Sequence, residues 1–236
     1  MLQTTVAGIS LHCCIYNASG PRSGSKEALQ KIVSSSAGAV VSKSSTLEKR
    51  HGNVLPRFVE SVHLNTYCAG SFSAEGLPNF GIDYYISKDI VDMTTQYNKP
   101  YIVSLSGLSL ADNLQMLSKI FSSDTVTQIA GIEYNLACPN IPGKSVVSND
   151  LEQMNDVLKA VTELPGFGKI PMGVKLGPYF DMSMFKAAVD VISKYPIKFV
   201  VSCNNIGNAL FIDAENECEA MAANRGMGGL GGGFIK

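Results

Sequence analysis

Short runs of apolar and β-branched residues recur along the chain, and amphipathic stretches follow several of them. Runs of this length at this spacing predict the strands of a parallel sheet joined by helical crossovers. Six candidate strands fit the pattern, namely residues 14–19, 38–43, 101–107, 131–137, 172–177 and 198–203. The sequence therefore indicates an α/β protein built from about six βα units.

The stretches between these runs have the periodicity of helices. In residues 150–164, for example, apolar side chains recur at intervals of three and four, which buries one face of a helix. Ser109 precedes one such stretch and Asp181 or Ser183 precedes another, and these residue types cap helix amino termini. We expect these helices to pack on the sheet.

Two regions depart from the pattern. Residues 44–82 are rich in Gly, Pro, Asn and Ser, which predicts a long irregular loop. A long loop in a compact domain is usually functional, so this segment is a candidate wall of the active site. The chain ends in a glycine-rich run at 226–236 with no helical stretch after it.

Six units do not close an eight-stranded barrel, so we expect a (β/α)8 TIM barrel that is truncated after about six βα units and occupies residues 1–236 as a single domain. An open, doubly wound sheet of six strands is the alternative. That fold calls for a glycine-rich phosphate loop after the first strand, and the sequence NASGPRSG at 17–24 fits this requirement poorly.

Charge and composition exclude several classes of protein. The 19 Lys and Arg residues are balanced by 20 Asp and Glu residues, which argues against a nucleic-acid partner. The six cysteines show no CxxC spacing and the three histidines form no HxxxH pair, so we expect reduced thiols and no metal site. No run is long and apolar enough for a membrane span, and the start has no targeting pattern. A cytoplasmic location is therefore expected.

The carboxyl ends of parallel barrel strands converge on one mouth, so the residues there belong together. They are Ala18, Ser19, Gly20, Lys43, Ser44, Ser106, Gly107, Asn135, Cys138, Lys175, Asn204 and Asn205. An unpaired buried ammonium is costly, and either lysine alone could instead extend to solvent. Two lysines at one mouth favour an anionic ligand.

Seven segments, in this order, resemble motifs of one family. They are NASG (17–20), GAVVSKSSTLEKRHGNVLPR (38–57), GLPN (76–79), CPNIPGK (138–144), GVKLGPYFD (173–181), NIGN (205–208) and GMGGLGG (226–232). The family is that of the class 1A, cytosolic, fumarate-linked dihydroorotate dehydrogenases. The resemblance runs from about residue 10 to the end of the chain.

The resemblance implies an FMN-binding (β/α)8 barrel that oxidises (S)-dihydroorotate to orotate in de novo pyrimidine (UMP) biosynthesis. Fumarate would accept the electrons and become succinate, and a cytoplasmic homodimer would be the working form. In the family, the last strands of the barrel and a glycine-rich backbone hold the FMN phosphate. Because the present sequence lacks that segment, we expect it to retain FMN weakly.

Site residues follow from the same resemblance. Cys138 would be the base that removes a C5 proton of dihydroorotate while C6 gives a hydride to the flavin, which requires a thiol of lowered pKa or a water relay. For a lone cysteine, buried packing would be the simpler interpretation. The implied FMN contacts are Ala18, Ser19, Gly20, Lys43, Ser44, Asn135, Lys175, Cys203 and Gly232. The implied substrate contacts are Lys43, Ser73, Gly76, Leu77, Asn135, Asn140, Asn204 and Asn205.

The sequence also departs from the family motifs. Ser73 stands where the family has asparagine, Glu75 where it has methionine, and Asn205 where it has serine. Glu75 would bring negative charge toward a carboxylate-bearing substrate unless its side chain points to solvent. These differences motivate an alternative, a catalytically weakened flavin- or ligand-binding paralogue or a non-functional fragment of the family. A tRNA-modifying flavin barrel is a third possibility, but it needs a basic surface that the charge balance does not favour.

Overall fold

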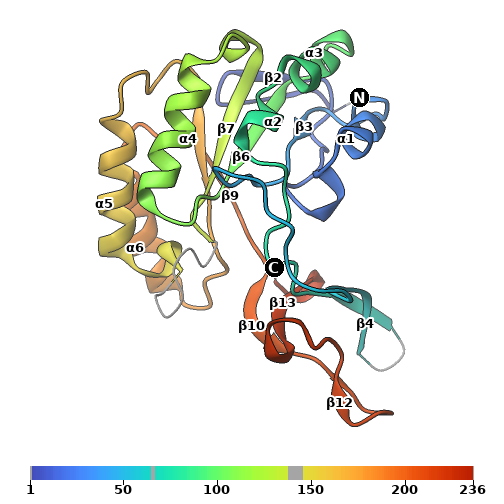
Figure 1. Ribbon diagram of the computed structural model, residues 1–236. Helices are drawn as coiled ribbons and strands as arrows, with labels where there is room; N and C mark the ends of the chain where they lie inside the picture. The colour runs from blue at the N-terminus through green and yellow to red at the C-terminus, as the bar shows by residue number, and fades with distance from the viewer. Residues whose placement is uncertain (1, 65–66, 138–145, 236) are drawn as a thin grey trace.

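The computed structural model describes residues 2–64, 67–137 and 146–235. Its main sheet contains five parallel strands in the order β3-β6-β7-β8-β9. They are β3 (Val40–Val41), β6 (Tyr101–Leu105), β7 (Ile129–Asn135), β8 (Met172–Lys175) and β9 (Phe199–Val201). Figure 1 shows this sheet in the larger body of the molecule, with helices packed along it. Five of the six predicted strands are thus confirmed.

Helices follow the strands as the periodicity predicts. They are α1 (Lys26–Val33), α2 (Ile82–Tyr85), α3 (Lys88–Gln96), α4 (Leu110–Ser122), α5 (Leu151–Thr162) and α6 (Met182–Ile192). The Ser109 hydroxyl caps α4 by accepting from the Asp112 N–H at 3.1 Å. At α6 the cap is Asp181, whose side chain accepts from the Ser183 N–H at 2.8 Å, so Ser183 is not the cap.

Successive side chains of each strand point to opposite faces of the sheet. On β6, Tyr101, Val103 and Leu105 lie in the large apolar cluster shared with the helices, whereas Ile102 belongs to a second cluster. That second cluster contains residues of an amino-terminal hairpin, formed by β1 (Thr4–Val6) and β2 (Ile9–Leu11). The inner face of the sheet is therefore apolar at the amino ends of its strands.

The predicted strand at residues 14–19 is wrong, because this segment is irregular. One of its side chains, that of Asn17, makes the two hydrogen bonds to the β3 backbone that a neighbouring strand would make. The Asn17 carboxamide donates to the Val41 carbonyl at 2.7 Å and accepts from the Val41 N–H at 2.9 Å. A side-chain amide, rather than the backbone of a neighbouring strand, thus pairs with the N–H and carbonyl groups of Val41.

The prediction that residues 44–82 are irregular is also wrong in part. This segment contains β4 (Phe58–Leu64) and β5 (Tyr67–Ser73), which join β10 (Ile206–Leu210) and β13 (Met227–Gly232) in an antiparallel sheet ordered β10-β13-β5-β4. Figure 1 shows this second sheet beyond the carboxyl ends of the parallel strands, together with the hairpin of β11 (Ile212–Asp213) and β12 (Cys218–Glu219).

Glycine explains why composition misled the prediction for the second sheet. A Cβ atom added at Gly70 would lie 1.9 Å from the Gly231 carbonyl oxygen, so β5 and β13 approach too closely for any larger residue there. Small residues are usually a sign of a loop, but here they permit close backbone contact.

Gly173 on β8 has a similar role inside the main sheet. A Cβ atom there would meet the Phe199 ring at 2.2 Å. Gly173→Ala is therefore expected to lower the free energy of unfolding by about 1–3 kcal/mol, the usual cost of overpacking. Urea denaturation would measure this, with Gly207→Ala as the control, since a Cβ at Gly207 meets nothing within 4 Å. Equal stabilities for the two variants would contradict the expectation.

Candidate active site

Polar side chains gather inside the sheet toward the carboxyl ends of the parallel strands. The strands are in register there, so side chains of neighbouring strands lie in layers. From the mouth inward, the layers are Asn135 with Lys175, then Ser104 with Glu133, then Ile102 with Val41. The interior thus changes from apolar at the amino ends to polar at the mouth.

A buried carboxylate, Glu133, lies one layer below the mouth and is 4% exposed. Its Oε1 accepts a hydrogen bond from Ser104 Oγ at 2.7 Å and another from Ser19 Oγ. A serine hydroxyl has a single proton to donate, so both serines use theirs on this oxygen. Glu133 is therefore the common acceptor of two hydroxyl groups that come from different parts of the chain.

Each serine in turn accepts from a residue nearer the mouth. Lys175 Nζ donates to Ser19 Oγ at 3.2 Å. Ser44 Oγ lies 2.9 Å from Ser104 Oγ, and Asn135 Nδ2 donates to Ser44 Oγ at 3.4 Å. These hydrogen bonds join six residues, which we call the Glu133 network: Ser19, Ser44, Ser104, Glu133, Asn135 and Lys175. All of them except Ser104 and Glu133 are site residues implied by the resemblance.

The Glu133 carboxylate also affects a group outside the network, the Tyr16 phenol. Burial raises the pKa of the Tyr16 phenol above its ordinary value, and the nearby Glu133 carboxylate raises it further. A negative charge opposes ionisation of a neighbouring phenol. The Glu133 carboxylate therefore opposes the ionisation of a group that lies outside the network.

Both predicted lysines are buried at the mouth, with Lys43 6% and Lys175 8% exposed. Lys43 follows β3, and its backbone N–H donates to the Ser23 carbonyl at 2.9 Å. Neither residue extends to solvent, so the alternative that either lysine is a surface residue does not hold. The strand-end residues named from the sequence include no carboxylate, but Glu133 lies one layer beneath them.

Two carboxamides hold the backbone that leads to the predicted base. Asn135 Oδ1 accepts from the Ala137 N–H at 3.0 Å, and Asn204 Nδ2 donates to the Ala137 carbonyl at 3.5 Å. Ala137 directly precedes Cys138 in the sequence. Cys138 and Asn140 themselves lie outside the described residues.

Ser106 is a further polar group at this end of the sheet. It follows β6 and is fully buried, and its Oγ has no hydrogen-bond partner among the described residues. Leaving a buried hydroxyl unpaired costs free energy, so such groups commonly face a ligand or an ordered water.

The other predicted contacts are distributed between the mouth and the second sheet. Ala18 and Gly20 flank Ser19, and Cys203 lies half-buried between β9 and β10. The remaining ones belong to the second sheet and its adjoining loop: Ser73 at the end of β5, Gly76 and Leu77 after it, Asn205 just before β10, and Gly232 at the end of β13. The Asn205 carboxamide lies against Gly229, where an added Cβ would be 1.9 Å from its Nδ2.

Glu75, the charged departure in the predicted substrate loop, is paired within the protein. Its Oε2 lies 3.7 Å from Nε of Arg57, and its side chain is only 17% exposed. This side chain therefore does not point to solvent, and it lies against an arginine of the segment that directly precedes β4.

Sequence reasoning missed Glu133 and Ser104. A charged residue in the middle of an otherwise apolar strand, as in GIEYNLA at 131–137, was the available signal for Glu133. Ser104 could not have been found in this way, because its importance depends on the register between β6 and β7.

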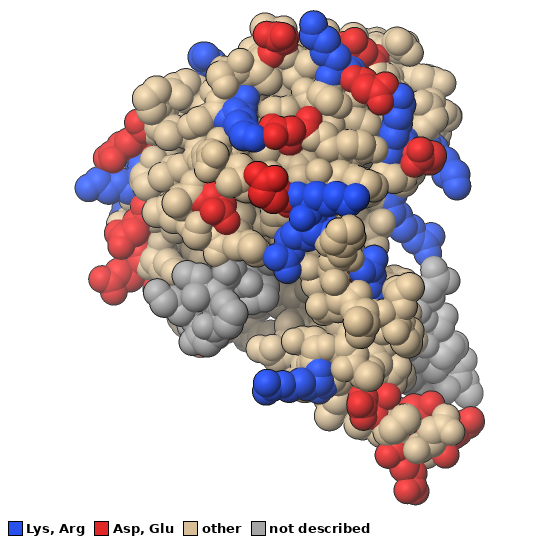
Figure 2. Space-filling view, viewed as in Figure 1, with Lys and Arg blue, Asp and Glu red and all other residues tan. Residues whose placement is uncertain are grey.

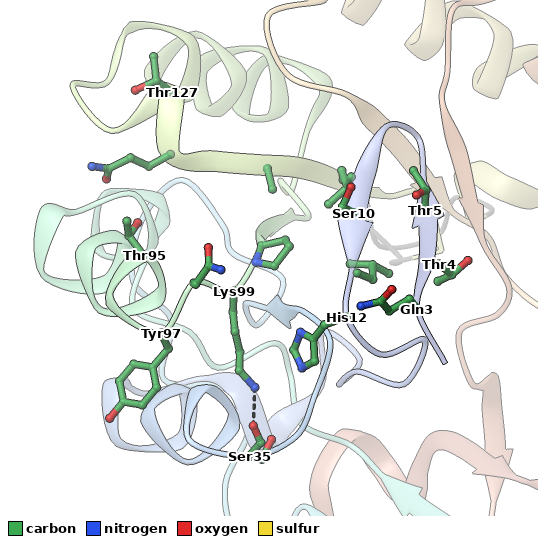
Figure 3. A pocket seen from close by; sticks show the side chains of 16 residues that line it. Gln3, Thr4, Thr5, Ser10, His12, Ser35, Thr95, Tyr97, Lys99 and Thr127 are labelled. Carbon is green, nitrogen blue, oxygen red and sulfur yellow. Dashed lines mark hydrogen bonds between the residues drawn. The ribbon is translucent and has the colours of Figure 1, made fainter. Parts of the chain in front are cut away.

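A hollow of about 1050 Å³ lies at the opposite end of the parallel sheet (Figure 3). It is lined by residues of the β1–β2 hairpin, the end of α3, the segment that leads into β6 and the start of β7. Its cation, Lys99, donates to the Ser35 carbonyl and, at 2.7 Å, to the Ala37 carbonyl. Active sites of parallel barrels lie at the carboxyl ends of the strands, so this hollow is not the candidate active site.

Figure 2 shows Lys and Arg side chains interspersed with Asp and Glu over the larger body, with acidic side chains at the β11–β12 hairpin. This face has no continuous basic stripe of the kind that binds nucleic acids. Among the described residues, no helix has the length and apolar character needed to span a bilayer.

Comparison with known proteins relates the chain to characterised relatives. The family model described as dihydroorotate dehydrogenase matches residues 1–236. The chain is 41% identical over 238 residues to the dihydroorotate dehydrogenase A (fumarate) of Lactococcus lactis subsp. lactis, and covers 72% of that relative. It is 40% identical over 222 residues to the dihydroorotate dehydrogenase (fumarate) of Trypanosoma cruzi, with 93% of this chain and 67% of the relative covered.

A solved structure has the same fold. The crystal structure of DHODH from Eimeria tenella in complex with ferulenol superposes with a TM-score of 0.66, and the match covers 98% of this chain and 65% of that one at 13% identity. The parallel sheet and its helices are thus part of the TIM-barrel fold expected from the sequence. The chain belongs to the dihydroorotate dehydrogenase family, in its fumarate-linked class 1A branch.

Proposed function

We propose that the protein uses FMN to oxidise (S)-dihydroorotate to orotate at the mouth formed by β3, β6, β7 and β8. The observation that carries the proposal is the Glu133 network, which holds one ammonium group and one carboxamide at this mouth. Family membership supplies the reaction class. Fumarate as electron acceptor, pyrimidine biosynthesis, the homodimer and the cytoplasmic location remain proposals that follow from the resemblance.

The residues at the mouth suit a flavin. FMN would supply the hydride acceptor, and its ring gains negative charge near N1 and O2 on reduction. Lys175 and Lys43 are buried cations that could offset that charge, and Ser106 offers a buried hydroxyl without a partner among the described residues. Ala18, Ser19, Gly20, Ser44, Cys203 and Gly232 are proposed as the further FMN contacts.

The substrate would lie among the carboxamides. Its ring alternates N–H and C=O groups, and a carboxamide can both donate and accept. Asn135 and Asn204 already use one polar atom each on the Ala137 backbone, which fixes their orientation. Lys43, Ser73, Gly76, Leu77, Asn140 and Asn205 complete the proposed set, and Cys138 is the proposed base. Because Arg57 neutralises Glu75, the charged departure does not oppose the substrate carboxylate.

The Ser106→Ala variant distinguishes the effect of this hydroxyl on FMN affinity from its effect on the free energy of unfolding. The variant is expected to keep or slightly raise the free energy of unfolding, by up to about 1 kcal/mol, since it removes an unpaired buried hydroxyl. Its affinity for FMN should fall by about fivefold, the value of one ordinary hydrogen bond.

Ser148→Ala is the matched control for stability. Ser148 is also buried, but its Oγ accepts from the Gly177 N–H at 3.2 Å, so its loss should cost about 1–3 kcal/mol. Urea denaturation and FMN titration measure the two quantities. A Ser106→Ala protein that unfolds as easily as Ser148→Ala would contradict the expectation.

A binding experiment tests the proposed function. The protein is titrated with FMN to high concentration, with quenching of flavin fluorescence as the signal, and orotate is then added while the visible flavin spectrum is recorded. Saturable quenching followed by a spectral shift with orotate is expected. Quenching that never saturates, or saturation with no response to orotate, would overturn the proposal.

A further inference from the structure

The Glu133 network has a defined direction of hydrogen bonding. Ser19 and Ser104 both donate to Glu133 Oε1. Because the single Ser104 proton is used in this way, Ser44 must be the donor in the Ser44–Ser104 contact. The carboxylate therefore determines which way each hydroxyl points.

Two arms leave the carboxylate, and each ends in a nitrogen donor at the mouth. One arm runs through Ser19 to Lys175 Nζ, and the other runs through Ser104 and Ser44 to Asn135 Nδ2. An ammonium group has three protons and a carboxamide nitrogen has two. In the described part of the chain each nitrogen makes one hydrogen bond within the network, so protons remain for a ligand.

The carboxylate also limits the positive charge at the mouth. Lys175 is buried in the same layer as Asn135, and Glu133 lies in the layer beneath. In a site of low dielectric constant, a carboxylate one side chain away weakens the attraction of an ammonium group for a negatively charged ligand. Its removal would leave that attraction stronger.

We propose that Glu133 is a positioning residue that orients Lys175 and Asn135 through the two serine arms and sets how strongly the site prefers reduced over oxidised FMN. The inference rests on the proposed function and deepens it. Reduced FMN carries more negative charge near N1 than oxidised FMN, so the carboxylate disfavours the reduced form relative to the oxidised one.

Glu133→Gln tests the charge directly, because glutamine has nearly the same shape. The dissociation constants of oxidised FMN and of dithionite-reduced FMN are measured separately under anaerobic conditions. We expect the ratio of the oxidised to the reduced constant to rise about tenfold, which corresponds to about 30 mV for a two-electron couple. Glu133→Asp, which keeps the charge, should restore a ratio near that of the wild type.

Glu163→Gln is the matched control, since Glu163 is exposed at the end of α5 and remote from the network, and its ratio should equal that of the wild type. A merely structural role for Glu133 would weaken both affinities together and leave the ratio unchanged, and that result would overturn the proposal.

Ser104→Ala gives a second, independent test should Glu133→Gln fold poorly. It breaks the Asn135 arm and keeps the carboxylate, so both affinities should fall by a similar factor of about fivefold with an unchanged ratio. Unchanged affinities would overturn the positioning role. A wild-type protein that takes up neither form of FMN would overturn the proposed function and this inference with it, whereas normal uptake with no shift in Glu133→Gln overturns the inference alone.

Discussion

Replacing Cys138 with alanine is expected to slow reduction of bound FMN by dihydroorotate by about 10²- to 10⁴-fold, the usual contribution of a positioned general base. The proton to be removed lies next to a carbonyl group, and the alanine variant has no group at this position to accept it. FMN affinity should change little, because the proposed role of the thiol is in proton transfer. Stopped-flow absorbance under anaerobic conditions measures the reduction rate.

Cys218→Ala is the matched control, since Cys218 is an exposed free thiol on β12. This variant should reduce at the wild-type rate. If Cys138→Ala also reduced at the wild-type rate, Cys138 would not be the base, and buried packing would become the better interpretation of that cysteine.

Lys175→Met is expected to weaken FMN binding by about 10- to 100-fold, the value of a hydrogen bond to a charged group. The variant should also lose stability, by about 1–3 kcal/mol, because the buried Ser19 hydroxyl, which donates to Glu133, loses the ammonium group that donates to it. FMN titration and urea denaturation test the two parts separately.

Lys159→Met provides the comparison, because Lys159 is exposed on α5 and its removal should leave both quantities unchanged. A Lys175→Met protein that binds FMN as tightly as the wild type would remove Lys175 from the proposed cofactor site. If the variant lost stability but kept its affinity for FMN, we would conclude that Lys175 has only a structural role.

The parallel strands could be predicted because they are short, largely apolar runs, and some, such as β6, are buried along their whole length. Helix starts could be predicted because a capping side chain acts within a few residues, as Ser109 does at α4. These features depend on local sequence alone.

The second sheet could not be predicted in this way, because it depends on contacts between distant segments. Gly70 and Gly231 resemble loop residues in the sequence, and only the pairing of β5 with β13 explains them. The Asn17 carboxamide likewise replaces a strand partner of Val41 through a contact between residues 24 positions apart.

The candidate site shows the same division. Lys43, Asn135 and Lys175 could be placed together because parallel strands end on one side of a sheet. Glu133 was not identified, because its hydrogen bonds to Ser19 and Ser104 span 114 and 29 positions of the sequence. The ion pair between Arg57 and Glu75 also required the fold of the second sheet.

The most direct test of the proposed function is an anaerobic titration of the FMN-saturated wild-type protein with dihydroorotate, with the visible absorbance of the flavin as the readout. We expect the flavin absorbance to bleach as dihydroorotate is added and to return when fumarate follows. A flavin that binds but stays oxidised at saturating dihydroorotate would contradict the proposed dehydrogenase activity and favour a flavin-binding paralogue, with Ser73 and Asn205 as the first positions to examine.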